Sequence, residues 1–483
     1  MERGGHPAGS SDGYGRSSSL DLLRALLKED RLPADALLGV LNDALLLEAD
    51  PLEHCIARLG VPQALAYARA AHWAGVPYEA ALPHRRKPAP APVRIDMLAT
   101  IRAVTLRGNG DDLIYLAPGF REFVGLRDYA VNHPAAAKRI RVVPPRALRQ
   151  HIVSANSPAL MASARQRLAR RWPHASAHLD LTLAMRAAFV GALLALIAAT
   201  VIAPFTGNPM LMTFAILIVT APAAMRLLAL AMHATPHLPS SLPLRPPDAE
   251  LPAYSVLLPL RDEAHMVPQL YRAIDALDYP PEKLDVKFVV EGDSRTTIAA
   301  VKPYLADPRF ELVVVPPAKP RTKPKAMNYA LPLVRGDHVV IFDAEDRPAK
   351  DQLWRAAHRF REAPEVACLQ AELAIDNGEE SLRSALFAGE YAALFGVVLP
   401  ALATWNLPVP LGGTSNHFRT QVLRAAGGWD SFNVTEDADL GVRLARLGHR
   451  VETLACHTLE EAPETLSAWM AQRTRWIKGW MQT

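Results

Sequence analysis

The stretch His338-Val-Val-Ile-Phe-Asp-Ala-Glu-Asp346 decides the fold that this sequence predicts. It begins as a short β-rich run and ends with three carboxylates in four residues. Carboxylates this close repel one another unless a positive charge lies among them. A hard divalent cation that bridges a diphosphate would satisfy them, because Mg²⁺ and Mn²⁺ favour carboxylate oxygen. The alternative is a solvated acidic turn.

Three further β-rich runs precede this one, and helical patterns separate them. The runs are 255–259, 286–290 and 311–315, and the helical stretches lie near 265–277, 296–305 and 324–333. Strands that alternate with helices predict an α/β fold, with a mostly parallel sheet and helices on both faces. Ligands of such sheets bind beyond the carboxyl ends of the strands, which is where the acidic motifs fall.

Polar groups also follow the second run and precede the third helical stretch. Glu291 and Asp293 could accept hydrogen bonds from a nucleotide base or ribose, although ordinary loop acids look the same in sequence. Lys323 and Lys325 stand at a predicted helix start, where phosphate binding is expected because backbone N–H groups attract anions. A solvated basic turn is the alternative.

Thr435-Glu436-Asp437 opens an amphipathic helix. Thr435 suits the N-cap position, and the helix dipole favours acids in the first turn, which is a complete structural explanation. A carboxylate fixed there could also act as a general base that takes a proton from an attacking hydroxyl. These residues alone leave both interpretations open.

The last motif is Gln472-Arg-Thr-Arg-Trp476. Gln472, Arg475 and Trp476 are spaced i, i+3, i+4 and share one helix face, whereas Arg473 lies off that face. An Arg can clamp a diphosphate, and a Trp ring can stack on a sugar. A packing Trp beside a surface Arg is the alternative.

Taken in order, these segments resemble the cellulose-synthase-like group of family 2 glycosyltransferases, from about Tyr254 to the end of the chain. The motifs that carry the resemblance are Glu291-Gly-Asp-Ser, Lys325-Ala-Met-Asn, Asp343-Ala-Glu-Asp, Gly413-Thr-Ser-Asn, Thr435-Glu-Asp and Gln472-Arg-Thr-Arg-Trp. The resemblance implies a GT-A fold over residues 252–483, a nucleotide-diphosphate sugar donor, Mg²⁺ or Mn²⁺, and inversion at the anomeric carbon.

The same resemblance implies a role for each motif. Asp437 would be the catalytic base, and Asp343 with Glu345 or Asp346 would hold the metal. The nucleotide sugar would meet Glu291, Asp293, Lys325 and Asp343. The acceptor and diphosphate side would comprise Gln472, Arg475, Trp476, Gly413, Thr414, Ser415, Asn416 and Glu436. Two departures leave alternatives open: Glu-Gly-Asp-Ser replaces the usual Asp-Asp-Gly-Ser, and Asp-x-Glu-Asp replaces Asp-x-Asp.

An uncharged stretch from Ala187 to Met225 precedes these motifs. The turn cluster Pro204-Phe-Thr-Gly-Asn-Pro209 divides it, which predicts a transmembrane hairpin within 187–230, with helices at roughly 187–204 and 210–230. Arginines flank the hairpin on both sides and its loop carries no charge, so the positive-inside rule puts both flanks in the cytoplasm. A buried helical hairpin is the alternative.

The N-terminal half divides by composition. The sequence predicts a disordered tail at 1–19, a helical module at 20–82, a Pro-rich linker at 83–92 and a small α+β module at 93–160. The helical module resembles the N-terminal domain of type II secretion ATPases, which binds cyclic di-GMP in some bacterial relatives. Ser19-Leu-Asp21 stands where Arg-Leu-Gly is expected and Asp30 where Gly is expected, so we expect a packing module.

Composition excludes several classes of protein. A formal net charge of +4 is too small to indicate a nucleic-acid partner. The three cysteines have no short spacing, which argues against a disulfide framework or a zinc site and indicates a reducing compartment.

We therefore expect a multi-pass protein of the bacterial inner membrane that extends a β-linked polysaccharide at the cytoplasmic face, from a UDP-linked sugar. Its expected partners are the nucleotide sugar, a glycan or lipid acceptor, membrane lipid, and export or periplasmic proteins. Relatives continue into channel-forming membrane helices, so we expect such helices beyond Thr483. The alternatives are a transferase that adds one sugar to a lipid, and a non-catalytic membrane receptor or export scaffold, against which the intact acids argue.

Overall fold

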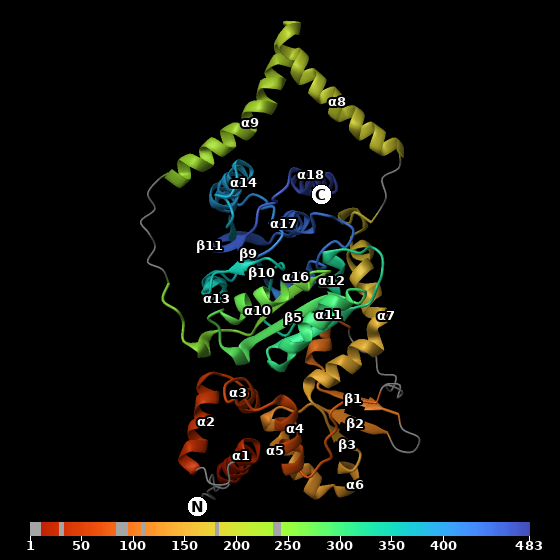
Figure 1. Cartoon of the computed structure of the whole chain (residues 1–483), viewed down its shortest axis with the longest axis vertical. Helices are drawn as coiled ribbons and strands as arrows, with labels where there is room; N and C mark the ends of the chain where they lie inside the picture. Colours follow the sequence, from red (N-terminus) through yellow and green to blue (C-terminus); the bar gives the residue numbers. More distant parts are fainter. Residues whose placement is uncertain (1–10, 29–32, 84–94, 108–111, 179–182, 235–242) are drawn as a thin grey trace, which may run out of the picture.

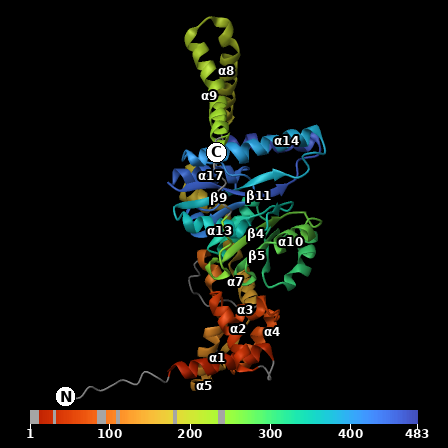
Figure 2. The ribbon, with the colours of Figure 1, turned by 90° about the vertical axis from the view of Figure 1, so that its left-hand side faces the viewer.

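The computed structural model describes residues 11–28, 33–83, 95–107, 112–178, 183–234 and 243–483. It has an N-terminal module, a larger domain built on a sheet, and a helical hairpin that projects from the far side of that domain (Figures 1 and 2). The chain passes from the module through the hairpin before it enters the sheet domain.

Eight strands form the sheet, in the order β6-β5-β4-β7-β10-β9-β11-β8. They are β4 (Tyr254–Leu260), β5 (Leu284–Glu291), β6 (Phe310–Val315), β7 (His338–Ile341), β8 (Arg347–Pro348), β9 (Val366–Ile375), β10 (Asn416–Arg419) and β11 (Arg450–Glu460). The first four strands of that order are mutually parallel. Strand β10 runs antiparallel to both of its neighbours, so the second half of the sheet is mixed.

Helices cover both faces of this sheet. They are α10 (Val267–Asp275), α11 (Arg295–Val301), α12 (Lys323–Ala330), α13 (Gln352–Glu362), α16 (Thr420–Ala425) and α17 (Glu436–Arg446), with short turns η3 (Asp248–Glu250), η4 (Pro281–Lys283), η5 (Lys302–Ala306) and η6 (Leu331–Leu333). Alternate strand residues point to opposite faces. Val256 and Leu258 pack in one core with α10 and α13, and Leu257 packs in the other with α12.

The α/β fold predicted from the sequence is confirmed. The four predicted strands correspond to β4 to β7, and the three predicted helical stretches correspond to α10, α11 with η5, and α12 with η6. The sequence analysis did not identify β8 to β11, because none of them is a continuous apolar run.

The N-terminal module combines helices with a three-stranded sheet. Its elements are α1 (Ser11–Leu27), α2 (Ala34–Leu46), α3 (Pro51–Ala57), α4 (Gln63–Trp73), η1 (Ile95–Thr100), β1 (Ala103–Leu106), β2 (Leu113–Leu116), α5 (Phe120–Asn132), α6 (Pro134–Ala137) and β3 (Ile140–Val142). The segments predicted as separate modules share one core. Tyr67 of α4 packs edge-on against Phe123 of α5, and Tyr78 forms a β-bridge with Val142.

Two predicted boundaries differ from the structure, and a third lies almost wholly outside the described residues. The tail predicted for 1–19 is helical from Ser11, since elongation of a helix that the Leu-rich turns have already nucleated costs little; residues 1–10 lie outside the described residues. The linker predicted for 83–92 also lies outside them, apart from Pro83. The boundary predicted at 160 falls inside α7 (Pro145–Arg171).

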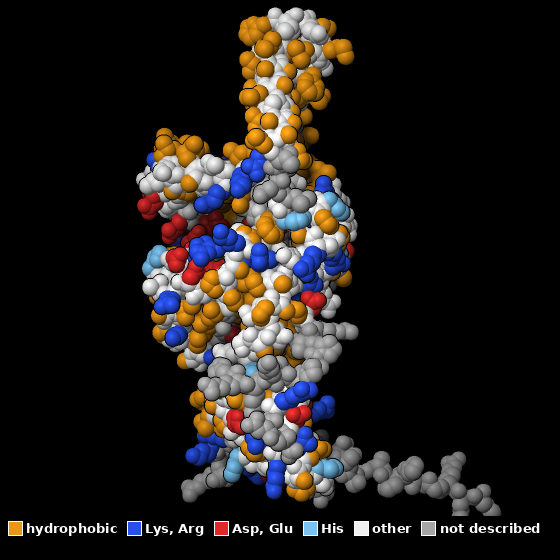
Figure 3. Space-filling model, turned by 90° about the vertical axis from the view of Figure 1, so that its right-hand side faces the viewer, with side chains coloured by type: hydrophobic (Ala, Val, Ile, Leu, Met, Phe, Trp, Pro, Cys, Tyr) orange, Lys and Arg blue, Asp and Glu red, His pale blue; other side chains and the backbone are white. Residues whose placement is uncertain are grey.

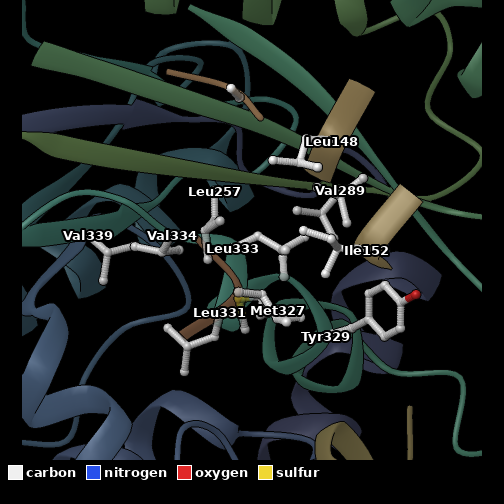
Figure 4. Packing of buried hydrophobic residues seen from close by; sticks show 14 of the residues in the cluster. Leu148, Ile152, Leu257, Val289, Met327, Tyr329, Leu331, Leu333, Val334 and Val339 are labelled. Carbon is white, nitrogen blue, oxygen red and sulfur yellow. The ribbon is translucent and has the colours of Figure 1, made fainter. Parts of the chain in front are cut away.

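Helix α7 joins the module to the sheet domain. Leu148 and Ile152 of α7 pack against Leu257, Val289 and the residues of α12 and η6 (Figure 4). Buried ion pairs support this contact at the amino ends of the strands. Arg149 pairs with Glu311 at 3.1 Å, and Lys287 bridges Glu311 at 2.9 Å and Asp285 at 3.1 Å.

Past α7 and η2 (Pro173–Ala175) come the two hairpin helices, α8 (Leu183–Thr206) and α9 (Pro209–Ala234). Both are long and apolar enough to cross a membrane. A third candidate runs from Leu382 to Thr404 through α14 (Leu382–Ala393), η7 (Leu394–Val398) and α15 (Leu399–Thr404), and the sequence analysis missed it. The last helix, α18 (Leu466–Trp480), lies beside α14 at the hairpin side of the sheet domain.

Candidate active site

A pocket of about 240 Å³ opens at the carboxyl ends of β4, β5 and β7. It is lined by Pro259, Leu260, Arg261, Glu263, Val289, Glu291, Arg321, Thr322, Lys323, Ala326, Asp343, Ala344 and Glu345. Figure 3 shows acidic side chains gathered in a hollow of this domain, with basic side chains at its edge. Three of the predicted donor residues, Glu291, Asp343 and Glu345, therefore lie in one cavity.

The predicted nucleotide-binding residues form two ion pairs. Lys325 is fully buried and pairs with Glu291 at 2.8 Å, which fixes both side chains at the base of the pocket. Asp293 is half-exposed and pairs with Arg321 at 3.1 Å. A ligand can reach the second pair more easily, because only the first is closed off from solvent.

The acidic turn after β7 separates its three carboxylates. Asp343 contacts the Lys323 ammonium at 2.5 Å and, like Glu345, lines the pocket. Burial raises the pKa of Glu345, and the charge of Asp343 adds to that shift. Asp346 is completely buried and accepts a hydrogen bond from the Asp343 amide at 2.6 Å, so this side chain does not line the pocket.

Asp346 instead connects the acidic turn to the Gly413-Thr-Ser-Asn416 loop. Thr414 donates its hydroxyl proton to the same Asp346 oxygen, and the other oxygen of that carboxyl has no hydrogen-bond partner. Burial raises the pKa of Asp346 well above its usual range, and Glu460 and Asp343 contribute. A neutral, protonated carboxyl is the form that this environment favours.

Hydrogen bonds and a left-handed backbone turn fix the conformation of the Gly413-to-Asn416 loop. Ser415 adopts φ of 56°, unusual for a residue other than glycine, and its hydroxyl donates to Thr458 at 2.6 Å. Asn416 donates to the Gly412 carbonyl at 2.7 Å. Thr414, Ser415 and Asn416 are buried, so Gly413 is the member of the predicted acceptor loop that is exposed.

Glu436 and Asp437 lie at the start of α17, buried and close to Lys323. Thr435 takes the N-cap position but makes no side-chain capping bond, so that part of the structural explanation is not realised, whereas the acids do lie in the first turn of α17. Burial raises the pKa of Glu436 to about 7, with Lys323 opposing the shift. Burial and then Glu436 raise the pKa of Asp437 well above its usual range, and Lys323 again opposes.

Glu263 follows β4 and lines the pocket, where an acid after the first predicted strand was expected to accept hydrogen bonds from a base or ribose. Glu460 escaped the sequence analysis. It ends β11, and burial raises its pKa to about 8, with Asp343 and Glu345 adding to the shift. An acid at a strand end was the available signal, but β11 itself was not predicted.

Gln472, Arg475 and Trp476 of helix α18 do not form one shared packing face as expected. Arg473, predicted to lie off the functional face, pairs with Glu390 of α14 and lies 4.7 Å from the Trp476 ring centroid. Trp476 also packs near Phe387 of α14, at 6.4 Å between ring centroids. Arg475 is exposed. Gln472 is partly buried, and its side-chain oxygen has no hydrogen-bond partner.

The end of α18 contacts the residue that precedes Glu436. A Cβ added to Gly479 would lie 2.1 Å from the Thr435 hydroxyl oxygen, so glycine is required for this approach. The Gln482 side chain accepts from the Val434 amide at 3.3 Å, and Asn433 donates to Thr483 at 3.2 Å. The Gln472-to-Trp476 helix and the Thr435-Glu-Asp motif are thus parts of one assembly.

Comparison with known proteins agrees with this arrangement. The model of the family described as "Glycosyltransferase like family 2" matches residues 252–479. Residues 252–479 are a family 2 glycosyltransferase domain. Its sheet has the GT-A-like α/β architecture, with the pocket at the carboxyl ends of the parallel strands.

Curated relatives of the glycosyltransferase domain have different printed functions. A "Beta-monoglucosyldiacylglycerol synthase" of Trichormus variabilis is 28% identical over 235 residues, which is 48% of this chain and 50% of the relative. A "Poly-beta-1,6-N-acetyl-D-glucosamine synthase" of Staphylococcus aureus is 25% identical over 233 residues, 48% of this chain and 55% of the relative. The chain thus spans about half the length of the curated relatives it matches.

Among solved structures, a mannosyltransferase from Pyrobaculum calidifontis in complex with GDP-Man and Mn²⁺ is similar. It has a TM-score of 0.44 and 23% sequence identity, and the match covers 60% of this chain and 72% of that one.

The described side chains of this domain do not by themselves form a complete set of metal ligands. Within the part of the chain that the structure describes, no three His, Cys, Asp or Glu side chains are arranged around a common metal position. Mg²⁺ sites in nucleotide-dependent enzymes use one or two carboxylates and complete their coordination with substrate phosphates and water. Asp343 and Glu345, which line the pocket together, fit that pattern.

Proposed function

We propose that the glycosyltransferase domain transfers a sugar from a nucleotide-diphosphate sugar to a glycan acceptor, with inversion at the anomeric carbon. The observation that carries this proposal is that acids from two separate motifs act on one ammonium. Asp343 contacts Lys323 at 2.5 Å, and the charges of Glu436 and Asp437 help to raise the pKa of Lys323. Two acidic motifs this far apart in sequence have no structural need to converge. A transfer site needs such convergence, because donor, leaving group and base must meet within a few ångströms.

In this mechanism Asp437 is the general base. It would take the proton of the acceptor hydroxyl as that oxygen attacks the anomeric carbon from the face opposite the leaving diphosphate. A raised pKa suits a base that must hold the proton near neutral pH. Lys323 opposes that shift and so favours the ionised form that abstracts the proton.

A divalent cation, Mg²⁺ or Mn²⁺, would be held by Asp343 and Glu345 and would neutralise charge on the leaving diphosphate. Glu291 and Asp293 would bind the nucleotide base and ribose, and Lys325 would hold Glu291 in place. Gln472, whose side-chain oxygen is unpaired, and the exposed Arg475 are available to the acceptor and the diphosphate. Trp476 would offer a ring to a sugar.

The product we favour is a β-linked polymer, supported by the Gln-x-x-Arg-Trp motif and by the poly-N-acetylglucosamine synthase among the relatives. A glycolipid with one sugar is the second candidate, since another relative is a glucosyldiacylglycerol synthase. The length of the product separates the two.

We propose an inner-membrane protein whose hairpin α8–α9 spans the bilayer and whose glycosyltransferase domain lies at the cytoplasmic face. Exposed apolar side chains of the same domain support contact with lipid. They lie on α14 and at α18, and are Leu382, Leu386, Leu466, Met470, Ile477 and Trp480. Apolar side chains exposed together in this way usually mark a membrane or protein contact.

The test uses membranes that contain the full chain and four donors: UDP-glucose, UDP-N-acetylglucosamine, UDP-N-acetylmannosamine and GDP-mannose. We expect transfer from one of them, loss of transfer with EDTA, and recovery with Mn²⁺. If none of the four is consumed in a metal-dependent way that the Asp437→Asn variant lacks, the proposed function is wrong and a receptor or export scaffold becomes the better interpretation.

A further inference from the structure

Lys323 lies between the two halves of the proposed site. Its ammonium is 2.5 Å from the Asp343 carboxylate, which lines the pocket, and 2.6 Å from the Gly413 carbonyl, which belongs to the loop on the acceptor side. A quarter of the Lys323 side chain is exposed. A lysine carries its charge on a flexible four-carbon chain, so this ammonium can move between neighbouring acceptors.

Neighbouring cations differ from Lys323 in their contacts. Lys325 is completely buried, pairs with Glu291 and donates to the Ala318 carbonyl at 3.2 Å. Arg321 pairs with Asp293 on the nucleotide side. Lys323 is the lysine of this group that contacts both Asp343 and the Gly413 loop.

The ammonium of Lys323 supplies Asp343 with the charge that a divalent cation would otherwise supply. Both cations would contact the same carboxylate group. Two unit charges 4 Å apart interact by about 4 kcal/mol at the effective dielectric constant near a protein surface. A metal ion at Asp343 and an ammonium 2.5 Å from the same carboxylate therefore weaken each other's binding.

We propose that Lys323 is a mobile counter-ion: it neutralises Asp343 while the donor is absent, and moves to the leaving diphosphate when metal and nucleotide sugar bind. The proposal rests on the proposed function and deepens it. It explains why one lysine at the first turn of α12 contacts the donor side and the acceptor loop at once.

In the transfer step the acceptor oxygen forms a bond to the anomeric carbon, and the bond from that carbon to the phosphate oxygen breaks. The electron pair of the broken bond leaves on the nucleoside diphosphate, and the hydroxyl proton goes to Asp437. The diphosphate gains negative charge as this happens. An ammonium already beside it stabilises that charge without rearrangement of solvent.

The experiment compares the purified full chain with its Lys323→Met variant, and uses Lys302→Met as the matched control, because Lys302 is an exposed lysine of η5. The first readout is Mn²⁺ binding without nucleotide, followed by the electron paramagnetic resonance signal of free Mn²⁺. We expect Lys323→Met to bind Mn²⁺ several-fold more tightly than the wild type, because the competing ammonium is gone.

The second readout is turnover of the nucleotide sugar, which we expect Lys323→Met to lower by about 10²–10³-fold, the usual loss when one stabilising donor is removed. The Lys323→Arg variant should recover part of that rate. Lys302→Met should match the wild type in both readouts.

Unchanged or weaker Mn²⁺ binding in Lys323→Met, with a native circular dichroism spectrum, would overturn the counter-ion role. Tighter Mn²⁺ binding without any loss of turnover would overturn the second half of the proposal, the move to the diphosphate. A wild-type chain that turns over no donor, in which Lys323→Met still tightens Mn²⁺ binding, would overturn the proposed function and support the counter-ion at Asp343.

Discussion

Carboxylates cluster at both ends of the central sheet, buried or partly buried, but with different partners. At the amino ends of β5 and β6, Asp285 and Glu311 meet Lys287, Arg149 and Arg335. At the carboxyl ends, the acids outnumber the basic side chains that contact them. They are Asp343, Glu345, Asp346, Glu436, Asp437 and Glu460, around Lys323.

The pKa values of Glu311 and Glu460 move in opposite directions. Burial acts to raise the pKa of Glu311, but Lys287 and Arg149 outweigh it and lower that pKa to about 2. Burial raises the pKa of Glu460 to about 8, because the charges nearest to it are other acids. Clusters of buried acids without enough partners cost stability, and their retention is typical of functional sites. The comparison therefore separates structural charges from functional ones within one sheet.

Lys287→Met should have the strongest effect on folding. It leaves Asp285 and Glu311 buried without their shared cation, and breaking a buried pair costs about 3–5 kcal/mol. The measurement is the midpoint of thermal unfolding of the full chain in detergent. Lys302→Met, the exposed lysine, should leave the midpoint unchanged, and an equally small shift in Lys287→Met would show that the amino-end network is not structural.

Asp437→Asn should lower activity and leave stability intact, the reverse of what we expect for Lys287→Met. The rate of sugar transfer should fall by about 10²–10⁴-fold, the usual contribution of a general base. The unfolding midpoint should stay the same or rise, because a neutral amide replaces a buried carboxyl whose ionised form is disfavoured. A variant that both transfers sugar at the wild-type rate and unfolds earlier would place Asp437 with the structural charges.

Gly479→Ala tests whether α18 and α17 act together. The new methyl group would clash with Thr435, and overpacking of this kind costs about 1–3 kcal/mol. We expect transfer to fall because the start of α17 shifts. Gly389→Ala is the matched control, since a Cβ at Gly389 of α14 meets nothing within 4 Å. Equal activity in both variants would contradict the coupling.

Changes in pH should have the smallest effect on folding stability. They should distinguish the acids at the amino ends of the strands from those at the carboxyl ends. Glu311, with its lowered pKa, contributes stability that is present above the unfolded-state value of about 4.3 and is lost as pH falls towards 2. Glu436 and Glu460, with raised values of about 7 and 8, contribute stability that is present below 4.3 and is lost as pH rises through 7 and 8.

Thermal unfolding of the full chain between pH 4 and pH 9 measures both limbs. Glu460→Gln should flatten the alkaline limb and leave the acid limb unchanged. A steeper alkaline limb in that variant would show that Glu460 is paired in solution, contrary to its surroundings here.

The sequence predicted the parallel half of the fold because each strand there is a local apolar run with a local helix after it. It did not predict β11 or the acid at its end, because β11 mixes polar and apolar residues and lacks a continuous apolar run. The convergence of Asp343 and Asp437 followed from the order of the motifs, while Lys323 between them did not. The packing of Arg473 was not predicted, because its partner Glu390 lies on α14, a helix that the sequence analysis did not identify.

Helix α7 has a further consequence. It is a single helix of 27 residues, about 40 Å long at 1.5 Å per residue, with the N-terminal module at one end and the approach to the hairpin at the other. Its length sets how far the module stands from η2, the turn that precedes the hairpin helices. One inserted residue would lengthen it by about 1.5 Å and turn one end by about 100° against the other, so the helix fixes both the distance and the orientation of the module relative to that turn.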